Sequence, residues 1–291
     1  MKKLSFTQRN NQQHWVGNGF PVRSVFSYND RAAEFSPFLL LDYAGPAEFP
    51  PTTERKGVGE HPHRGFETVT IVYAGEVEHR DSAGGGGIIG PGDVQWMTAA
   101  GGIVHEEFHG PAFAKNGGAF EMVQLWVNLP AKDKMAKPGY QGIAAATIPR
   151  IELPAGAGAV RVIAGDYQGT TGPARTFSPV NVWDVSLVAG RGTSMRVPAG
   201  HTTVLFVMRG KVRLAGNETV GEAEAAVLER AGDEFGVEAV ENTSLLVLNG
   251  LPFAEPVVGH GPFVMNTRAE IQQAITDYQN GKMGRINTAV H

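Results

Sequence analysis

Two stretches decide the predicted fold: HPHRGFE at residues 61–67 and GIVHEE at residues 102–107. Each contains two side chains with metal-binding atoms two residues apart, His61 with His63 and His105 with Glu107. Alternate side chains of a β-strand point to the same face, so each pair would face one way from its strand. If the two strands are neighbours in one barrel, three imidazoles and one carboxylate converge. Such a set suits a first-row transition metal and leaves positions open for substrate or oxygen.

Glu67 is a second candidate for the carboxylate ligand, because it has the same alternation as His61 and His63. We favour Glu107 as the ligand, which leaves Glu67 as a strand residue or as a hydrogen-bond partner that orients an imidazole. Gly65 permits a β-bulge that would change the face to which Glu67 points.

Four further side chains are candidates for a place near the site. His79 and Asp81 alternate on a predicted strand at residues 77–81 and could lie near the barrel mouth, and a solvated hairpin end explains them equally well. Gln124 and Trp126 could line the cavity, with a place in the aromatic core as the alternative.

The composition is that of a globular protein with many turns. Hydrophobic residues make up 42% and charged residues 19% of the 291-residue chain, unlike disordered or membrane proteins. The 38 glycines and 18 prolines suit an all-β protein. A formal charge of −4, without a long basic run, gives no indication of nucleic-acid binding. The absence of cysteine excludes disulfides, thiolate metal sites and cysteine nucleophiles.

The N-terminal residues form no apolar signal region, and no segment approaches the ~20 apolar residues of a membrane span. We therefore expect a cytoplasmic protein without a membrane partner.

Short segments with strand character occupy both halves of the chain. Residues 67–73 are β-branched and aromatic, which is typical of a strand. An apolar run at residues 38–43 is followed by a predicted turn at residues 44–46. Residues 132–173 are loop-like apart from one predicted strand at residues 159–164, so we place a domain boundary in this region.

The second half repeats the first in weak form. Two similar strands, each followed by a glycine, lie 135 residues apart in the two halves, and two Gly-Asp pairs lie 140 residues apart. At the second offset His105 and Glu107 fall on Leu245 and Val247, and the other proposed ligands are lost as well. We therefore predict a duplicated β-barrel of which only the first copy holds metal.

A helix is predicted near the end of the chain. Thr267 and Glu270 form a capping box. Apolar residues at positions 271, 274, 275 and 278 form one stripe, which must be buried on one of the barrels. Gly281 fits a C-cap.

Motifs in order along the chain resemble the pirin family, a branch of the bicupin proteins. The matching segments are His61–Thr68, Gly75–Ser82, Pro91–Thr98, Gly102–Glu107, Gln124–Pro130 and Gly261–Thr267. The resemblance implies an all-β fold of two jelly-roll (cupin) β-barrels packed face to face, with a C-terminal helix. We expect an N-terminal metal-binding cupin domain at residues 1–145 and a degenerate C-terminal cupin domain with the terminal helix at residues 146–291.

The resemblance also implies one metal ion, usually iron, held by the residues that match His61, His63, His105 and Glu107. We expect Fe(II), and nickel, manganese, copper and zinc suit similar ligands. Some pirin relatives act as quercetin 2,3-dioxygenases, whereas others are regulatory or partner-binding proteins.

These features predict a metal-dependent dioxygenase that acts with oxygen on a small aromatic substrate such as a flavonol. Glu107, or Glu67 from behind the ligands, would accept the substrate's proton. The first alternative is a metal-bound, redox-sensing regulatory protein that binds a protein partner, and the second is a purely structural metal. The enzyme is favoured because a mixed histidine and carboxylate site with open positions is more than a structural metal requires.

Overall fold

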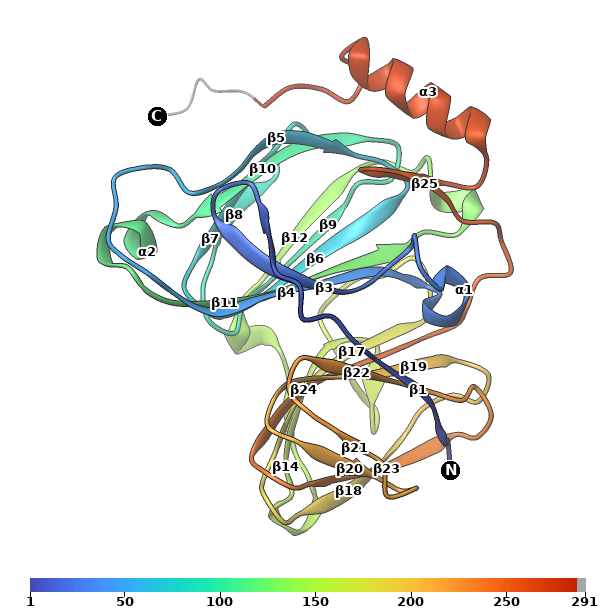
Figure 1. Cartoon of the computed structure of the whole chain (residues 1–291). Coiled ribbons are helices and arrows are strands. Elements are labelled where there is room, and N and C mark those ends of the chain that lie inside the picture. The colour runs from blue at the N-terminus through green and yellow to red at the C-terminus, as the bar shows by residue number, and fades with distance from the viewer. Residues whose placement is uncertain (287–291) are drawn as a thin grey trace. The chain divides into compact units, whose positions relative to one another are not determined.

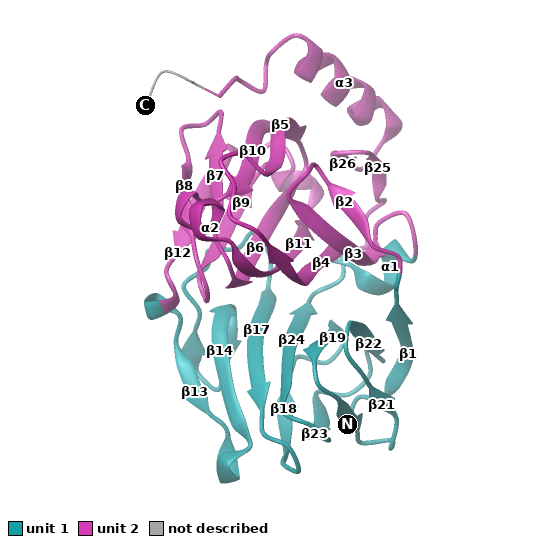
Figure 2. Ribbon diagram, turned by 60° about the vertical axis from the view of Figure 1, so that its left-hand side comes forward, with its two compact units in different colours: residues 1–11, 31–37, 146–253 teal, residues 12–30, 38–145, 254–291 magenta. Residues whose placement is uncertain are grey.

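The computed structural model describes residues 1–286, which divide into two compact units (Figure 2). Unit 1 consists of residues 1–11, 31–37 and 146–253, and unit 2 of residues 12–30, 38–145 and those from 254 onward. Both are built mainly from antiparallel strands, as predicted for two cupin barrels. No helix of the described residues is long and apolar enough to cross a membrane.

Unit 2 contains two main sheets (Figure 1). The larger has the order β12-β9-β6-β11-β4-β3-β2 and the smaller the order β5-β10-β7-β8. Its first strands are β2 (His14–Val16), β3 (Phe20–Ser27), β4 (Phe38–Phe49), β5 (Gly57–His63), β6 (Phe66–Ala74) and β7 (Val77–Asp81). The rest are β8 (Gly86–Ile89), β9 (Val94–Thr98), β10 (Ile103–His109), β11 (Gly118–Asn128) and β12 (Gly139–Ile143), and β25 (Val258–His260) pairs separately with β26 (Phe263–Met265).

Unit 1 has a seven-stranded sheet of order β1-β22-β19-β24-β17-β14-β13 and a four-stranded sheet of order β18-β23-β20-β21. Its first strands are β1 (Leu4–Arg9), β13 (Arg150–Glu152), β14 (Gly158–Ala164), β15 (Asp166–Tyr167), β16 (Thr170–Thr171), β17 (Val180–Leu187) and β18 (Gly192–Arg196). The rest are β19 (Thr202–Arg209), β20 (Val212–Leu214), β21 (Thr219–Val220), β22 (Glu224–Leu228), β23 (Glu234–Ala239) and β24 (Thr243–Gly250). The region of residues 132–173 therefore contains more strands than the single one predicted.

Helices are short and few. They are α1 (Ala32–Phe35) in unit 1, and α2 (Pro111–Asn116) and α3 (Arg268–Gln279) in unit 2. Single 3₁₀ turns lie at Ala131–Asp133, Ala145–Thr147 and Pro154–Gly156.

The two units share one strand order, which supports an internal duplication, but the predicted alignment of its last strands is wrong. Glu107 pairs with His79 in unit 2. In unit 1 Leu214, the residue 135 positions after His79, pairs with Val237. The counterpart of Glu107 is therefore Val237 in β23 and not Val247 in β24, because the loops before β23 are shorter than those before β10.

Strand β4 continues through the turn predicted at residues 44–46. Gly45 has a φ of 103°, and a Cβ atom there would lie 2.3 Å from the carbonyl oxygen of Phe120 on β11. The register between β4 and β11 shifts at this point. The Gly-Pro pair therefore forms a β-bulge that bends the strand without ending it.

The terminal helix packs within unit 2, whereas the predicted boundaries placed it in the second domain. Thr267 caps α3 by accepting the N–H of Glu270, as predicted. Ile271 and Ala274 are buried in a cluster with Val104 of β10. At the other end of the chain, β1 pairs with β22 in unit 1. Each unit is thus completed by a segment distant in sequence.

Candidate metal centre

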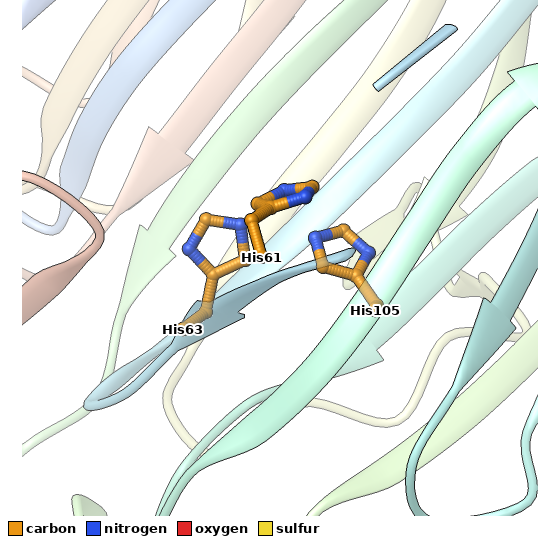
Figure 3. A group of neighbouring side chains, drawn as sticks. All are labelled: His61, His63 and His105. Atoms are coloured by element: carbon orange, nitrogen blue, oxygen red, sulfur yellow. The ribbon is translucent and has the colours of Figure 1, made fainter. Parts of the chain in front are cut away.

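Three histidines from neighbouring strands converge in unit 2 (Figure 3). His61 and His63 lie on β5, and His105 lies on β10 directly opposite His61 in the ladder. One ring nitrogen from each residue lies within 4.8 Å of the other two. Ring centroids are 4.2 Å apart for His61 and His105, and 4.8 Å apart for His63 and His105. The predicted convergence of these imidazoles is present in the structure.

The hydrogen bonds of the imidazoles leave nitrogen lone pairs available. Nδ1 of His61 lies 2.8 Å from the carbonyl oxygen of Gly59, and Nδ1 of His63 lies 3.3 Å from that of Pro262. A carbonyl oxygen only accepts, so Nδ1 carries the proton in both rings and Nε2 carries the lone pair. Nε2 of His105 is buried without a hydrogen-bond partner. An orphaned buried nitrogen beside two oriented imidazoles fits a metal site.

Burial keeps His63 and His105 neutral. Exposure is 4% for His63 and 0% for His105. Burial, followed by the proximity of His61, holds the pKa of both rings well below the ordinary value of 6.5. Neutral imidazoles have the lone pair that metal binding requires.

Glu107 is buried beside His105 but is not part of the three-histidine cluster. Its Oε1 accepts hydrogen bonds from Gln95 Nε2 at 3.0 Å and from the Thr70 hydroxyl at 3.3 Å. Its Oε2 accepts from Gln124 Nε2 at 3.1 Å. Its role as the fourth ligand stays a prediction. Gln95 and Thr70 were not identified from the sequence, although they pair directly on adjacent strands.

A second group of metal-binding atoms lies behind the first. Single ligand atoms of His79, His105 and Glu107 also lie within 4.8 Å of one another. The amide nitrogen of Gln95 contacts both Glu107 Oε1 at 3.0 Å and His79 Nδ1 at 3.2 Å. An N–H group at this position repels a cation. We therefore interpret the second group as a hydrogen-bonded support for His105.

His79 and Asp81 lie inside the barrel and not at a solvated hairpin end. Their exposures are 0% and 5%. His79 Nε2 lies 3.2 Å from Asp81 Oδ2. Burial raises the pKa of Asp81, but hydrogen bonds from His79 and from the backbone N–H groups of Gly85 and Ala83 outweigh that effect and bring it below its ordinary value.

Aromatic rings flank the histidines on two sides. Trp126, which is half-buried, stacks on Phe66 at a centroid distance of 4.2 Å and forms a T-shaped pair with His63 at 5.2 Å. Tyr140 stacks on His79 at 5.0 Å. Burial, with the nearby carboxylates, raises the pKa of Tyr140 to about 12, so the phenol is neutral. Tyr140 was not identified from the sequence, because it lies in a segment predicted to be a loop.

Glu67 faces away from the histidines, so it does not lie in the pocket where the sequence had suggested it. Thr70, which contacts Glu107, lies on the inner face of β6, and Glu67 is three residues away on the opposite face. The hydroxyl of Thr98 donates to Glu67 Oε1 at 2.7 Å. Burial raises the pKa of Glu67 to about 7.

Segment 258–286 supports His63 from outside the sheet. Pro262 offers the carbonyl that orients His63, and the next residue, Phe263, forms a β-bridge with Arg64. Arg64 is buried and donates to Asp277 of α3 at 2.9 Å. Hydrogen bonds from Lys282, Arg64 and Gln273 lower the pKa of Asp277 to about 2. The helix thus anchors the loop that follows His61 and His63.

The matching positions of unit 1 are apolar. Met195 pairs with Phe235 as His61 pairs with His105, and Val237 replaces Glu107. These side chains, with Leu214 in the place of His79, are buried in one core cluster. Within residues 1–286, the two groups of metal-binding side chains described above both lie in unit 2. Unit 1 therefore has the same strand order as unit 2, and apolar side chains occupy its centre.

Comparisons with known proteins agree with this organisation. Residues 19–127 match the Pirin family model, and residues 182–284 match the model of the Pirin C-terminal cupin domain. A Pseudomonas aeruginosa protein named "Putative quercetin 2,3-dioxygenase PA2418" is 58% identical over 287 residues, covering 99% of this chain and 100% of the relative. Pirin-1 of Arabidopsis thaliana is 38% identical over 276 residues, covering 92% and 90%.

A solved structure shows the same likeness in three dimensions. The crystal structure of quercetin 2,3-dioxygenase from Acinetobacter baumannii has 55% sequence identity and a TM-score of 0.96, and the match covers 99% of this chain and 100% of that one. Since the two family models cover most of the chain and its relatives align along nearly their whole length, this protein belongs to the pirin family of bicupins.

Proposed function

We propose that the protein is a metal-dependent dioxygenase that opens an electron-rich hydroxylated aromatic ring, with a flavonol such as quercetin as the expected substrate. The observation that carries the proposal is the convergence of three oriented imidazoles beside a buried carboxylate and the aromatic rings of Trp126 and Tyr140. The names of close relatives support the same substrate class.

His61, His63 and His105 would hold the metal, with Glu107 as the fourth ligand. Three neutral imidazoles and one carboxylate leave one net positive charge on a divalent ion, which favours an anionic bidentate substrate. We expect Fe(II), and nickel, manganese, copper or zinc suit the same donors. When bound, the metal supplies Lewis acidity toward the hydroxyl and keto oxygens of the substrate.

The protein side chains orient the substrate and accept its proton. The half-buried ring of Trp126, 5.2 Å from that of His63, would offer an apolar contact for an aromatic substrate. Glu107 would accept the hydroxyl proton, and Gln124 holds its Oε2 at 3.1 Å. Glu67 is not available as a base, because it lies on the other face of β6.

The test begins with elemental analysis of the purified protein and of a His105→Ala variant. Both are then loaded anaerobically with Fe(II) and exposed to air with quercetin. We expect the flavonol absorption band to disappear with matching oxygen uptake in the wild type and not in the variant. A metal-loaded wild type that leaves a panel of flavonols and catechols unchanged would refute the proposal.

One feature favours the alternative, a metal-bound redox-sensing protein that binds a protein partner. Unit 1 keeps a complete barrel without metal-binding side chains at its centre and has a groove of about 950 Å³, with Arg196 and His201 among its lining residues. Such a surface suits binding without chemistry. A pull-down that recovers no partner with either the Fe(II) or the Fe(III) protein would count against this alternative.

A further inference from the structure

Behind His105 runs a chain of hydrogen bonds that begins at Asp81. Oδ1 of Asp81 accepts the backbone N–H groups of Ala83 and Gly85, both at 2.8 Å. Its other oxygen, Oδ2, lies 3.2 Å from Nε2 of His79. A carboxylate only accepts, so Nε2 of His79 carries the proton and Nδ1 carries the lone pair.

Gln95 gives independent evidence for the lone pair on His79 Nδ1. Its amide nitrogen lies 3.2 Å from that atom and also donates to Glu107 Oε1 at 3.0 Å. Its amide oxygen accepts the hydroxyl of Tyr140 at 3.4 Å. The carboxylate of Glu107 only accepts and therefore fixes the direction of the amide, so Gln95 presents a donor to His79.

The next link is His105. Its Nδ1 lies 3.3 Å from Nδ1 of His79, and both rings are fully buried. Two lone pairs facing each other at this distance would repel, so Nδ1 of His105 carries the proton. The lone pair of His105 then lies on Nε2, the atom without a hydrogen-bond partner.

We propose that Asp81 and His79 are positioning residues that fix His105 in the tautomer whose Nε2 binds the metal. The inference rests on the metal site of the proposed function. It assigns the sequence His79-Arg80-Asp81 a role beyond lining the pocket. The second barrel is consistent with this role, because Leu214 takes the place of His79 where Phe235 takes that of His105.

The Asp81→Asn variant tests the order of donors and acceptors in the hydrogen bonds from Asp81 to His105. The two backbone N–H groups need an acceptor, so the amide oxygen of Asn takes the position of Oδ1 and its NH₂ group faces His79. To accept at Nε2, His79 must place its proton on Nδ1, although Gln95 also presents an N–H to that atom. That proton faces His105, whose own proton moves to Nε2, the nitrogen meant for the metal. Asp42→Asn, at a buried carboxyl bonded to Ser24, is the charge-matched control.

His79→Gln and His79→Leu separate positioning from packing. Glutamine offers an N–H to Asp81 and an oxygen to His105, as His79 does, whereas leucine offers neither. Circular dichroism verifies that each variant is folded before binding is measured.

The measurements are histidine ¹⁵N NMR on the metal-free protein and Zn²⁺ affinity by competition with a chelating dye. We expect the proton of His105 on Nδ1 in the wild type and on Nε2 in Asp81→Asn. Zn²⁺ affinity should fall about 10–100-fold in Asp81→Asn and His79→Leu. It should stay within about 3-fold of the wild type in His79→Gln and Asp42→Asn, since both variants keep a hydrogen-bond acceptor facing Nδ1 of His105.

An unchanged His105 tautomer in Asp81→Asn would overturn the inference, as would an affinity loss in His79→Gln equal to that in His79→Leu. Neither measurement contains a flavonol. A wild type that binds Zn²⁺ but opens no flavonol therefore refutes the proposed function alone, and the tautomer result still decides the role of Asp81 and His79.

Discussion

Glu67 should make the stability of the protein depend on pH. Its pKa lies at about 7 in the folded chain, against an ordinary value of 4.5, because burial disfavours the charged form. Between these values the unfolded chain has lost the proton and the folded chain retains it. Stability therefore falls as the pH rises from 4.5 to 7 and is constant above that. With about 1.36 kcal/mol per pKa unit, the loss is about 3 kcal/mol.

Glu67→Gln removes this dependence and keeps an oxygen for the Thr98 hydroxyl. Relative to the wild type, the variant should therefore gain about 3 kcal/mol between pH 4.5 and pH 8. Urea unfolding of the metal-free proteins, followed by tryptophan fluorescence, measures this difference. Trp15, Trp96 and Trp126 lie in unit 2, so the signal reports mainly on the unit that contains Glu67.

Histidine titrations occur in both proteins and cancel in the difference. Glu48→Gln, at an exposed position of the same unit, is the matched control, and its difference from the wild type should not change over this range. If the Glu67→Gln difference is equally flat, the carboxyl is ionised in the folded protein and the argument from burial fails.

Three further predictions follow from the site and from its apolar counterpart. Zn²⁺ at about 1,000 times its Kd should raise the free energy of unfolding by about 4 kcal/mol, measured by urea titration with and without chelator. An equal increase in the His105→Ala variant would contradict the assigned ligands. Trp126→Ala should raise KM for a flavonol about 3–10-fold with little change in kcat, because the ring supplies an apolar contact beside His63. An unchanged KM would remove Trp126 from the substrate site. Val237→Glu should destabilise unit 1 by about 3–5 kcal/mol, measured by urea unfolding at pH 8, since Leu205 and Val247 stand where Glu107 has hydrogen-bond donors. An unchanged midpoint of urea unfolding would show that the core of unit 1 is not closed and apolar.

Local patterns in the sequence were sufficient for several features. The spacing of His61, His63 and His105 identified the cluster, because alternation along a strand is a property of the backbone itself. The cap at Thr267 was predictable for the same reason, since its partner Glu270 lies within one helical turn. The internal repeat predicted two barrels, and the resemblance to pirin identified them as cupin barrels.

Long-range pairing decided the rest. Sequence alternation alone left both Glu67 and Glu107 as candidates. In the structure Glu107 on β10 accepts from Thr70 on the inner face of β6, whereas Glu67 lies on the opposite face of β6 and accepts from Thr98. The orientation of His79 depends on Gln95 and Tyr140, which come from different strands.

The residues with the chemistry to bind a metal could be identified from the amino-acid sequence, because side-chain identity and strand alternation are local. Which nitrogen of His105 remains free depends on the fold, because donors and acceptors from β7, β9 and β12 are brought together there. The fold also decided that α3 and Pro262 support His63, a contact between residues about 200 positions apart.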